Sequence, residues 1–341
     1  MQEINKNTKN SPGNFLTKIL TIFLILLFAV FVAYLSYFLY RDIPRAPQNL
    51  DFEINNNETF SNITTEISQF HPNMKFNHNN ISYKINSDCD IVKKQRMINA
   101  FNILSENVNI ISFHEIIDDS EISDIEITCT QDDKSLPDIE QEQKKNYFIA
   151  GECGAREIIQ TGKFNVITNG TVLLFKYPEN SLDCKYPNIE MHELMHVFGF
   201  DHSEDKNSIM NSYLVSCKQR LDISIINELK RLYSMKNLPD LYFESLKAVK
   251  KGRYLDFNLT IKNLGLIDAD NVTFSILDNN ELVETNKAGD IKFGAGIMIR
   301  IENLKLINLN SRQITFKIDN DNNIKELDKS NNIAEVKFPE S

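Results

Sequence analysis

The stretch HELMHVFGFDHS, residues 192–203, constrains the fold more than any other part of the chain. On a helix, His192 and His196 lie one turn apart, so both imidazoles project from the same face. Gly199 can adopt a left-handed backbone conformation and end that helix. The chain can then turn back and bring His202 to the same place. The spacing therefore predicts a helix that stops at a glycine turn, with three histidines converging on one point.

Three imidazoles in this arrangement predict a metal centre. A histidine pair at i and i+4 on a helix is the geometry that two zinc ligands need. Three protein ligands leave a fourth position open, as catalytic zinc sites do and structural sites do not. Glu193 is placed to act on a water molecule as a general base, not to bind the metal. The alternative is an ordinary pair of surface histidines, but the chain has only six histidines and three of them fall in this pattern.

The pattern HExxHxxGxxH followed by SIMNSY, residues 208–213, resembles the metzincins. In that group a methionine turn lies beneath the metal, and Met210 occupies its position here. Ser203 after the third histidine, and the lead GFDH, make the matrixins the most similar metzincins. The resemblance implies an α+β domain over residues 75–236, with a mixed sheet and a zinc-binding helix. It also implies a zinc-dependent metalloendopeptidase that hydrolyses proteins or peptides.

The sequence departs from the matrixin pattern in several places. Met195 replaces a glycine, Ser212 stands where a proline often follows the methionine turn, and no PRCGxxD prosegment occurs. Matrix metalloproteinases hold a second, structural zinc through upstream histidines. No histidine lies between His114 and His192, so one catalytic zinc ion is expected. Carboxylates could hold calcium, but no motif points to it. By resemblance, an extended substrate lies along an edge strand, expected within Thr171–Lys176.

Residues 19–40 read ILTIFLILLFAVFVAYLSYFLY and carry no charge. A helix of that length spans roughly 33 Å, enough to cross a bilayer core. A cleaved signal peptide is the alternative, but its apolar region covers only ~7–15 residues and ends at small side chains. This run is longer and ends in the bulky FLYRD. It therefore predicts a single-pass transmembrane anchor after a cytoplasmic tail, residues 1–18.

All five cysteines follow the anchor, which suggests an oxidising compartment for that part of the chain. Several N-x-S/T sequons, among them Asn258, point the same way. The positive-inside rule favours a cytoplasmic N-terminus slightly, because three lysines precede the span and two arginines follow it closely. We therefore expect the C-terminal domains to be extracellular, on the outer side of the cell membrane.

The metzincin resemblance implies a disulfide pattern. The first and third strands of that fold are parallel neighbours, so Cys89 and Cys129, which follow those strands, should pair. Cys184 precedes the zinc helix and Cys217 follows the methionine turn, so those two should pair as well. Cys153 is then left over, either as a free thiol or as a further metal ligand.

Two other function classes compete with an enzyme. A metzincin fold that only binds surface proteins is expected to lose its general base, and Glu193 is intact. A scaffold with a structural zinc needs a fourth protein ligand, and only Cys153 remains a candidate. Nucleic-acid binding is set aside, because the net charge is −10 and no basic face is evident.

Alternating and helical patterns divide the rest of the chain. Residues 41–74 are polar and predict a stalk. Strands are expected at 81–85, 111–116 and 124–129, with a helix over 88–107. A further strand pair is expected around a tight turn at Asn169-Gly170. Helices are expected from Pro187-Asn188, with Asn188 as N-cap, and near residues 222–235.

The region 239–341 predicts an all-β sandwich, because apolar and polar residues alternate at 255–261, 272–276, 297–301 and 314–318. The motifs PDL, IKNLGLIDADNVTFSI and IDNDNNIKELDKSNN make this region similar to CARDB-type modules, an Ig-like family. That resemblance implies binding to other surface molecules. A rigid spacer is an equal alternative, since a fold does not assign a function.

Overall fold

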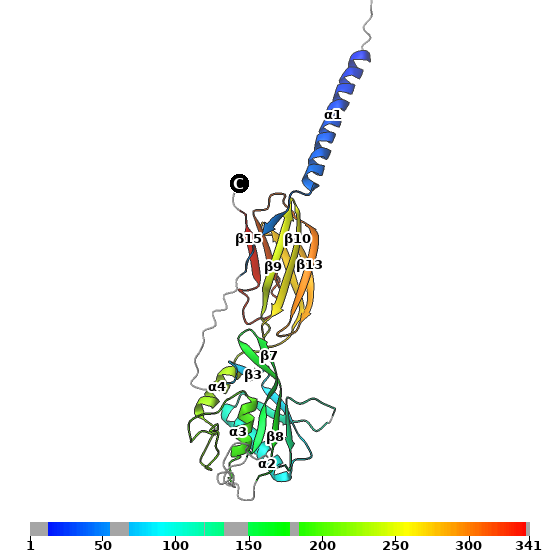
Figure 1. Ribbon diagram of the computed structural model, residues 1–341. Helices are drawn as coiled ribbons and strands as arrows, with labels where there is room; N and C mark the ends of the chain where they lie inside the picture. The colour runs from blue at the N-terminus through cyan, green and yellow to red at the C-terminus, as the bar shows by residue number, and fades with distance from the viewer. Residues whose placement is uncertain (1–12, 55–67, 119, 133–148, 178–183, 339–341) are drawn as a thin grey trace, which may run out of the picture.

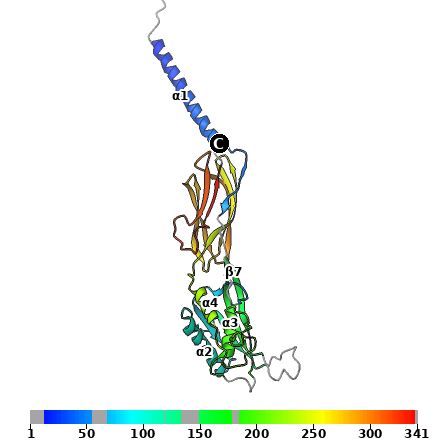
Figure 2. The same ribbon diagram turned by 90° about the vertical axis from the view of Figure 1, so that its left-hand side faces the viewer.

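The computed structural model describes residues 13–54, 68–118, 120–132, 149–177 and 184–338. Three parts follow one another in space: a long helix, a β-sandwich and an α+β domain (Figures 1 and 2). Helix α1 (Gly13–Asp42) contains one candidate membrane span, Thr17–Asp42, with a mean hydropathy of 2.8. A signal sequence would satisfy the same criteria of length and composition. Asp42 at its end accepts hydrogen bonds from Arg253 and Lys305 of the sandwich, at 3.0 and 2.9 Å.

Two antiparallel sheets form the sandwich. The first contains, in spatial order, β1 (Gln48–Leu50), β9 (Leu241–Lys251), β10 (Tyr254–Asn263) and β13 (Gly296–Lys305). The second contains β12 (Glu281–Ile291), β11 (Ala269–Asp278), β14 (Gln313–Ile318), β15 (Ile333–Lys337) and β2 (Glu53–Ile54). The alternation that predicted this region is the inward face of four of these strands; in β10, for example, Leu255, Phe257 and Leu259 are buried and Asn258 is exposed.

The predicted stalk is wrong for residues 48–54. β1 pairs with β9 through Leu50 and Ala248, and β2 pairs with β15 through Ile54 and Ala334. Leu50 is buried in the core of the sandwich. Strands that precede the α+β domain in sequence therefore complete the sandwich that follows it. As a result the sandwich lies next to α1, and the α+β domain lies beyond it (Figure 1).

The α+β domain is built on a mixed sheet. Four parallel strands lie in the order β5 (Ser112–Glu115), β4 (Asn80–Ile85), β6 (Ile125–Cys129) and β8 (Phe164–Leu174). The short β3 (Met74–Phe76) lies beside the start of β8, and the antiparallel β7 (Gly151–Thr161) follows its other side. Helices α2 (Ile91–Val108), α3 (Asn188–Val197) and α4 (Ile223–Tyr233) share one core with this sheet. The expected strands and helices of this domain are confirmed, with the exceptions that follow.

The prediction of a tight turn at Asn169-Gly170 is wrong, because β8 runs through both residues without interruption. Gly170 serves a different purpose: a Cβ there would lie 2.4 Å from Val197 Cγ1. The glycine lets α3 approach the sheet closely. The strand that pairs with β8 is β7. The sequence does not predict β7, because its residues do not alternate between buried and exposed positions.

The position expected for the edge strand is also wrong. Thr171–Leu174 lie within β8, which is flanked by β6 on one side and β7 on the other. Among the described residues, β7 pairs only with β8, so β7 is the antiparallel edge strand.

Two disulfides brace the domain, Cys89–Cys129 and Cys184–Cys217. They are the pairs that the metzincin resemblance implies. β4 and β6 are parallel neighbours, with Ile85 opposite Ile127, so the cysteines that follow them meet. Cys153 has a free thiol.

The far end of the β7–β8 hairpin rests on the sandwich. Phe164 and Val166 form a small buried cluster with Leu266. Thr161 Oγ1 donates to the carbonyl of Gly265 at 2.8 Å, and Asn77 Nδ2 donates to that of Leu266 at 3.1 Å. The two domains are therefore joined by apolar packing and by hydrogen bonds.

Candidate metal centre

Helix α3 carries the first two histidines and ends as the glycine predicts. Gly199 has φ +85°, and a Cβ at this position would lie 2.5 Å from Met74 Sδ. Gly199 N–H donates to the carbonyl of His196, and Phe200 N–H to that of Met195. Both the backbone conformation and the close contact with Met74 therefore require glycine.

The start of α3 differs from the prediction. The N-cap residue is Pro187, and Asn188 is the first residue of the helix. The Asn188 amide instead donates to the carbonyl of Gln219, at 2.8 Å. Because Gln219 follows the methionine turn, this bond and the disulfide Cys184–Cys217 tie the start of α3 to that segment.

The three histidines converge through their Nε2 atoms. His196 Nε2 lies 3.1 Å from His192 Nε2 and 3.2 Å from His202 Nε2. His192 Nδ1 lies 2.7 Å from the carbonyl of Ile209, and His196 Nδ1 lies 2.7 Å from that of Phe200. These carbonyls can only accept, so each Nδ1 carries the proton and the facing Nε2 atoms carry lone pairs.

Such lone pairs repel one another unless a cation lies between them. Nitrogens that bind zinc tetrahedrally at about 2.0–2.1 Å are separated by about 3.4 Å, close to the distances found here. Among the described residues, His192, His196 and His202 form the one group of at least three potential ligands that could hold a metal ion. The donor set therefore fits zinc, and carbonyls fix the imidazoles of His192 and His196 as supporting groups do around metal ligands.

Burial favours the neutral form of His192 and His196, which is the form that binds a metal. It lowers the pKa of His192 to about 3, with a further contribution from the neighbouring His196. Burial likewise lowers the pKa of His196.

Glu193 lies beside this group and is almost fully buried, at 6% exposure. Burial raises the pKa of its carboxyl to about 7. The Cys153 thiol donates to Glu193 Oε2 at 2.6 Å, and burial and this carboxylate raise the pKa of Cys153. The backbone of β7 also passes close to this side chain, because a Cβ added to Gly151 would lie only 2.8 Å from Glu193 Cδ. β7 therefore encloses the carboxylate.

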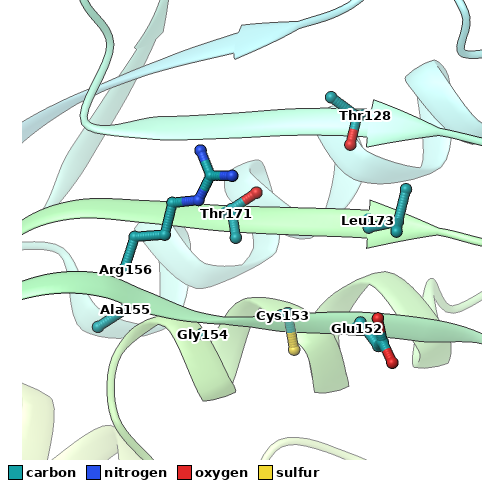
Figure 3. Close-up of a pocket in the computed structure, with 8 residues that line it drawn as sticks. All are labelled: Thr128, Glu152, Cys153, Gly154, Ala155, Arg156, Thr171 and Leu173. Carbon is teal, nitrogen blue, oxygen red and sulfur yellow. The ribbon is translucent and has the colours of Figure 1, made fainter.

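The roles of Gly151 and Cys153 were missed by sequence reasoning, since no motif marks β7. The same stretch of β7 also lines a shallow pocket, together with Thr128 of β6 and Thr171 and Leu173 of β8 (Figure 3). Figure 3 shows Arg156 lying across β8, and its guanidinium is 4.0 Å from the carboxylate of Glu126. That pair is largely exposed and forms no second metal site.

The methionine turn supports the first ligand. Met210 is buried, at 1% exposure, and its carbonyl accepts from Ser203 N–H at 2.8 Å. The carbonyl that fixes His192 belongs to the preceding residue, Ile209. The turn therefore links the segment after His202 to the imidazole of His192.

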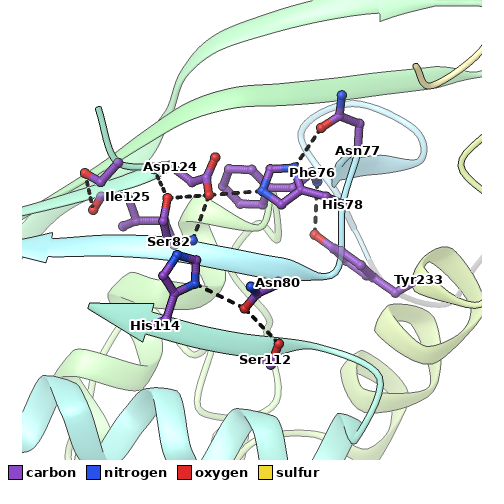
Figure 4. A network of polar contacts seen from close by, with 11 residues as sticks. Phe76, Asn77, His78, Asn80, Ser82, Ser112, His114, Asp124, Ile125 and Tyr233 are labelled. Atoms are coloured by element: carbon purple, nitrogen blue, oxygen red, sulfur yellow. Dashed lines mark hydrogen bonds and ion pairs between the residues drawn. The ribbon is translucent and has the colours of Figure 1, made fainter. Parts of the chain in front are cut away.

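A second polar cluster contains a serine, a histidine and an aspartate but lacks the geometry of a nucleophile (Figure 4). Ser82 Oγ donates to Asp124 Oδ2 at 2.6 Å, and His78 Nε2 lies 3.0 Å from the same oxygen. The hydroxyl thus contacts the carboxylate and not the imidazole, so the histidine cannot take its proton. The cluster ties β4 to the residue that precedes β6.

A sequence model of the Matrixin family matches residues 75–234, and one of the CARDB family matches residues 238–336. No curated protein matches the chain.

Similar solved structures include a CARDB domain from Pyrococcus furiosus, in complex with di-metal ions. It is 18% identical, and the match covers 30% of this chain and 96% of that one, with a TM-score of 0.26. Another is a domain of a putative cell surface protein from Methanosarcina acetivorans, 21% identical over 30% of this chain and 95% of that one, with a TM-score of 0.25. The chain therefore combines a matrixin domain, residues 75–234, with a CARDB domain, residues 238–336.

Proposed function

We propose that the chain is a membrane-anchored, extracellular zinc metalloendopeptidase. One observation carries this proposal: the Nε2 atoms of three histidines converge beside a buried carboxylate, within a matrixin domain. His192, His196 and His202 would hold the ion, which leaves an open position for substrate chemistry. When bound, zinc would act as a Lewis acid. It would activate water near neutral pH and polarise the scissile carbonyl.

Glu193 would be the general base. Its carboxylate accepts a proton from the attacking water and then passes that proton to the leaving amine. The raised pKa of this carboxyl, about 7, suits a group that must both take and give a proton near neutrality. Gly151 and Cys153 hold the carboxylate from the side of β7.

The edge of β7 that faces away from β8, which pairs with no other strand among the described residues, would bind the substrate as an added strand. Main-chain hydrogen bonds along such an edge give affinity for extended peptides of varied sequence. This edge replaces the expected Thr171–Lys176, because Thr171–Leu174 belong to β8, which has neighbouring strands on both sides. Protein or peptide substrates follow from the matrixin domain.

The proposed location rests on α1 and on the disulfides. An apolar helix long enough to span a bilayer precedes both domains, and two disulfides are characteristic of an oxidising compartment. Intact N-terminal sequence in protein extracted from membranes would support an anchor. Loss of residues 1–40 from the mature protein would show a cleaved signal sequence instead.

The test is cleavage of casein and a peptide library by the full chain in detergent, with and without a chelator. Glu193→Ala should keep stoichiometric zinc and lose activity by at least about 100-fold, because general-base catalysis contributes roughly 10²–10⁴. Glu106→Ala, at an exposed glutamate on α2, is the matched control. A zinc-loaded chain that cleaves nothing would contradict the proposal and favour the inactive, surface-binding alternative.

A further inference from the structure

Residues 68–70, here called the strap, precede residues 75–234, which the Matrixin model matches. They nevertheless lie against the loop that joins α3 to His202. Asp201 N–H donates to the carbonyl of Ser68 at 2.9 Å, and Phe70 N–H donates to that of Gly199 at 2.8 Å. Gln69 and Phe200 form an antiparallel bridge between these two bonds. The strap therefore pairs with the segment that joins α3 to His202.

The strap donates hydrogen bonds to backbone carbonyls at the C-terminal end of α3. The last carbonyls of an α-helix have no partner within the helix. Gln69 Nε2 donates to the carbonyl of Phe198 at 3.4 Å and to that of Met74 at 3.2 Å, while Gln69 Oε1 accepts from Met74 N–H at 3.3 Å. With the bond from Phe70 to Gly199, the strap satisfies two successive carbonyls just beyond α3.

The strap and the residues it pairs with contact the second and third histidines directly. Phe200, which pairs with Gln69, provides the carbonyl that fixes His196 Nδ1. The ring of Phe70 is stacked on that of His196, with centroids 5.8 Å apart and planes inclined by 28°. Asp201, held by the strap, is followed directly by His202, whose N–H donates to Asp201 Oδ1 at 2.7 Å.

We propose that the strap positions the second and third metal ligands, with Gln69 and Phe70 as positioning residues. This inference rests on the proposed function, because it takes zinc as the ion at the three histidines. It extends the metal centre beyond the matched domain to a segment that continues from the sandwich strands β1 and β2. A matrixin domain cut at residue 75 would contain every ligand and lack this support.

The test measures zinc affinity of the full chain in detergent micelles by competition with a chromophoric chelator. Gln69→Ala and Phe70→Ala should each weaken zinc binding by about 10–100-fold, the usual effect of removing a group that orients a metal ligand. Zinc should also leave these variants faster. Gln95→Ala, at an exposed glutamine on α2, should match the unaltered chain.

Gln69→Glu separates positioning from folding. The glutamate keeps the acceptor for Met74 N–H and loses the donors to Phe198 and Met74, so it should weaken zinc binding even if Gln69→Ala fails to fold. A strap that is only structural would lower the melting temperature of the metal-free protein and leave zinc affinity unchanged. Unchanged zinc affinity in folded Gln69→Glu and Phe70→Ala variants would overturn the inference. Failure of the unaltered chain to bind zinc would instead refute the proposed function.

Discussion

At the scale of single residues, the carboxylate beside the histidines is held by an edge strand as well as by its own helix. Glu193 lies against the backbone of Gly151 and accepts from the thiol of Cys153. Cys153 is the one cysteine of this domain with a free thiol, since the other four form disulfides. Burial and the carboxylate both raise the pKa of Cys153, which keeps it in the weakly reactive thiol form.

A prediction at this scale concerns Gly151. In Gly151→Ala, the new Cβ would lie 2.8 Å from Glu193 Cδ and displace the carboxylate. We expect kcat/KM for peptide cleavage to fall by about 10–100-fold, since small misplacements of a catalytic group have effects of that size. Zinc content and melting temperature should stay close to those of the unaltered chain. A fall in activity that only parallels zinc loss would contradict this account.

At the scale of elements, a loop of the sandwich is held by a buried carboxylate. Glu326 accepts from Leu241 N–H at 2.9 Å and from Asn332 Nδ2 at 2.8 Å. Its side chain is fully covered, and burial raises its pKa to about 7. Two hydrogen bonds and the nearby Lys329 only partly offset the loss of hydration.

This carboxylate predicts a pH dependence of stability. The folded pKa, about 7, lies above the ordinary value of 4.5, so the folded state binds the proton more tightly than the unfolded state. The contribution of Glu326 to the free energy of unfolding should therefore be largest below pH ~4.5 and should be lost as the pH rises to about 7. Glu326→Gln should reduce the drop in sandwich melting temperature between pH 5 and pH 8. An equal drop in both proteins would show that other groups cause it.

At the scale of the whole molecule, the sandwich lies between the apolar helix α1 and the matrixin domain (Figure 1). The sandwich strands β9 and β10 have eleven and ten residues and are about 35 Å long. Their length separates the three histidines from the end of α1. Contacts from Asp42 to Arg253 and Lys305 join α1 to the sandwich, and the β7–β8 hairpin joins the sandwich to the matrixin domain.

A prediction at this scale concerns Leu50, which lies before the matrixin domain in sequence but in the core of the sandwich. Leu50→Ala should destabilise the sandwich by about 2–5 kcal/mol, the usual cost of such a truncation in a core. Differential scanning calorimetry of the full chain should show the loss in the sandwich transition, while zinc affinity is unchanged. Gln48→Ala, at an exposed position of the same strand, is the control; equal melting of both variants would contradict the assignment.

The sequence by itself determined the local features of the site and most regular elements. Helical spacing placed His192 and His196 on one face, and Gly199 marked the turn because a left-handed conformation strongly favours glycine. Strict alternation revealed four sandwich strands, because one face of each is buried. The matrixin resemblance rested on the histidine motif and the methionine after it, and the CARDB resemblance on short stretches such as PDL and IKNLGLIDADNVTFSI.

Only the tertiary structure decided which distant segments complete each part. β7 has no clear alternation, so neither its place at the sheet edge nor its contacts with Glu193 could be read from its residues. β1 and β2 are too short and polar to indicate a partner far along the chain. Gly170 appeared to mark a turn, yet it serves a close helix contact. These features depend on contacts between residues remote in sequence, which local propensity does not encode.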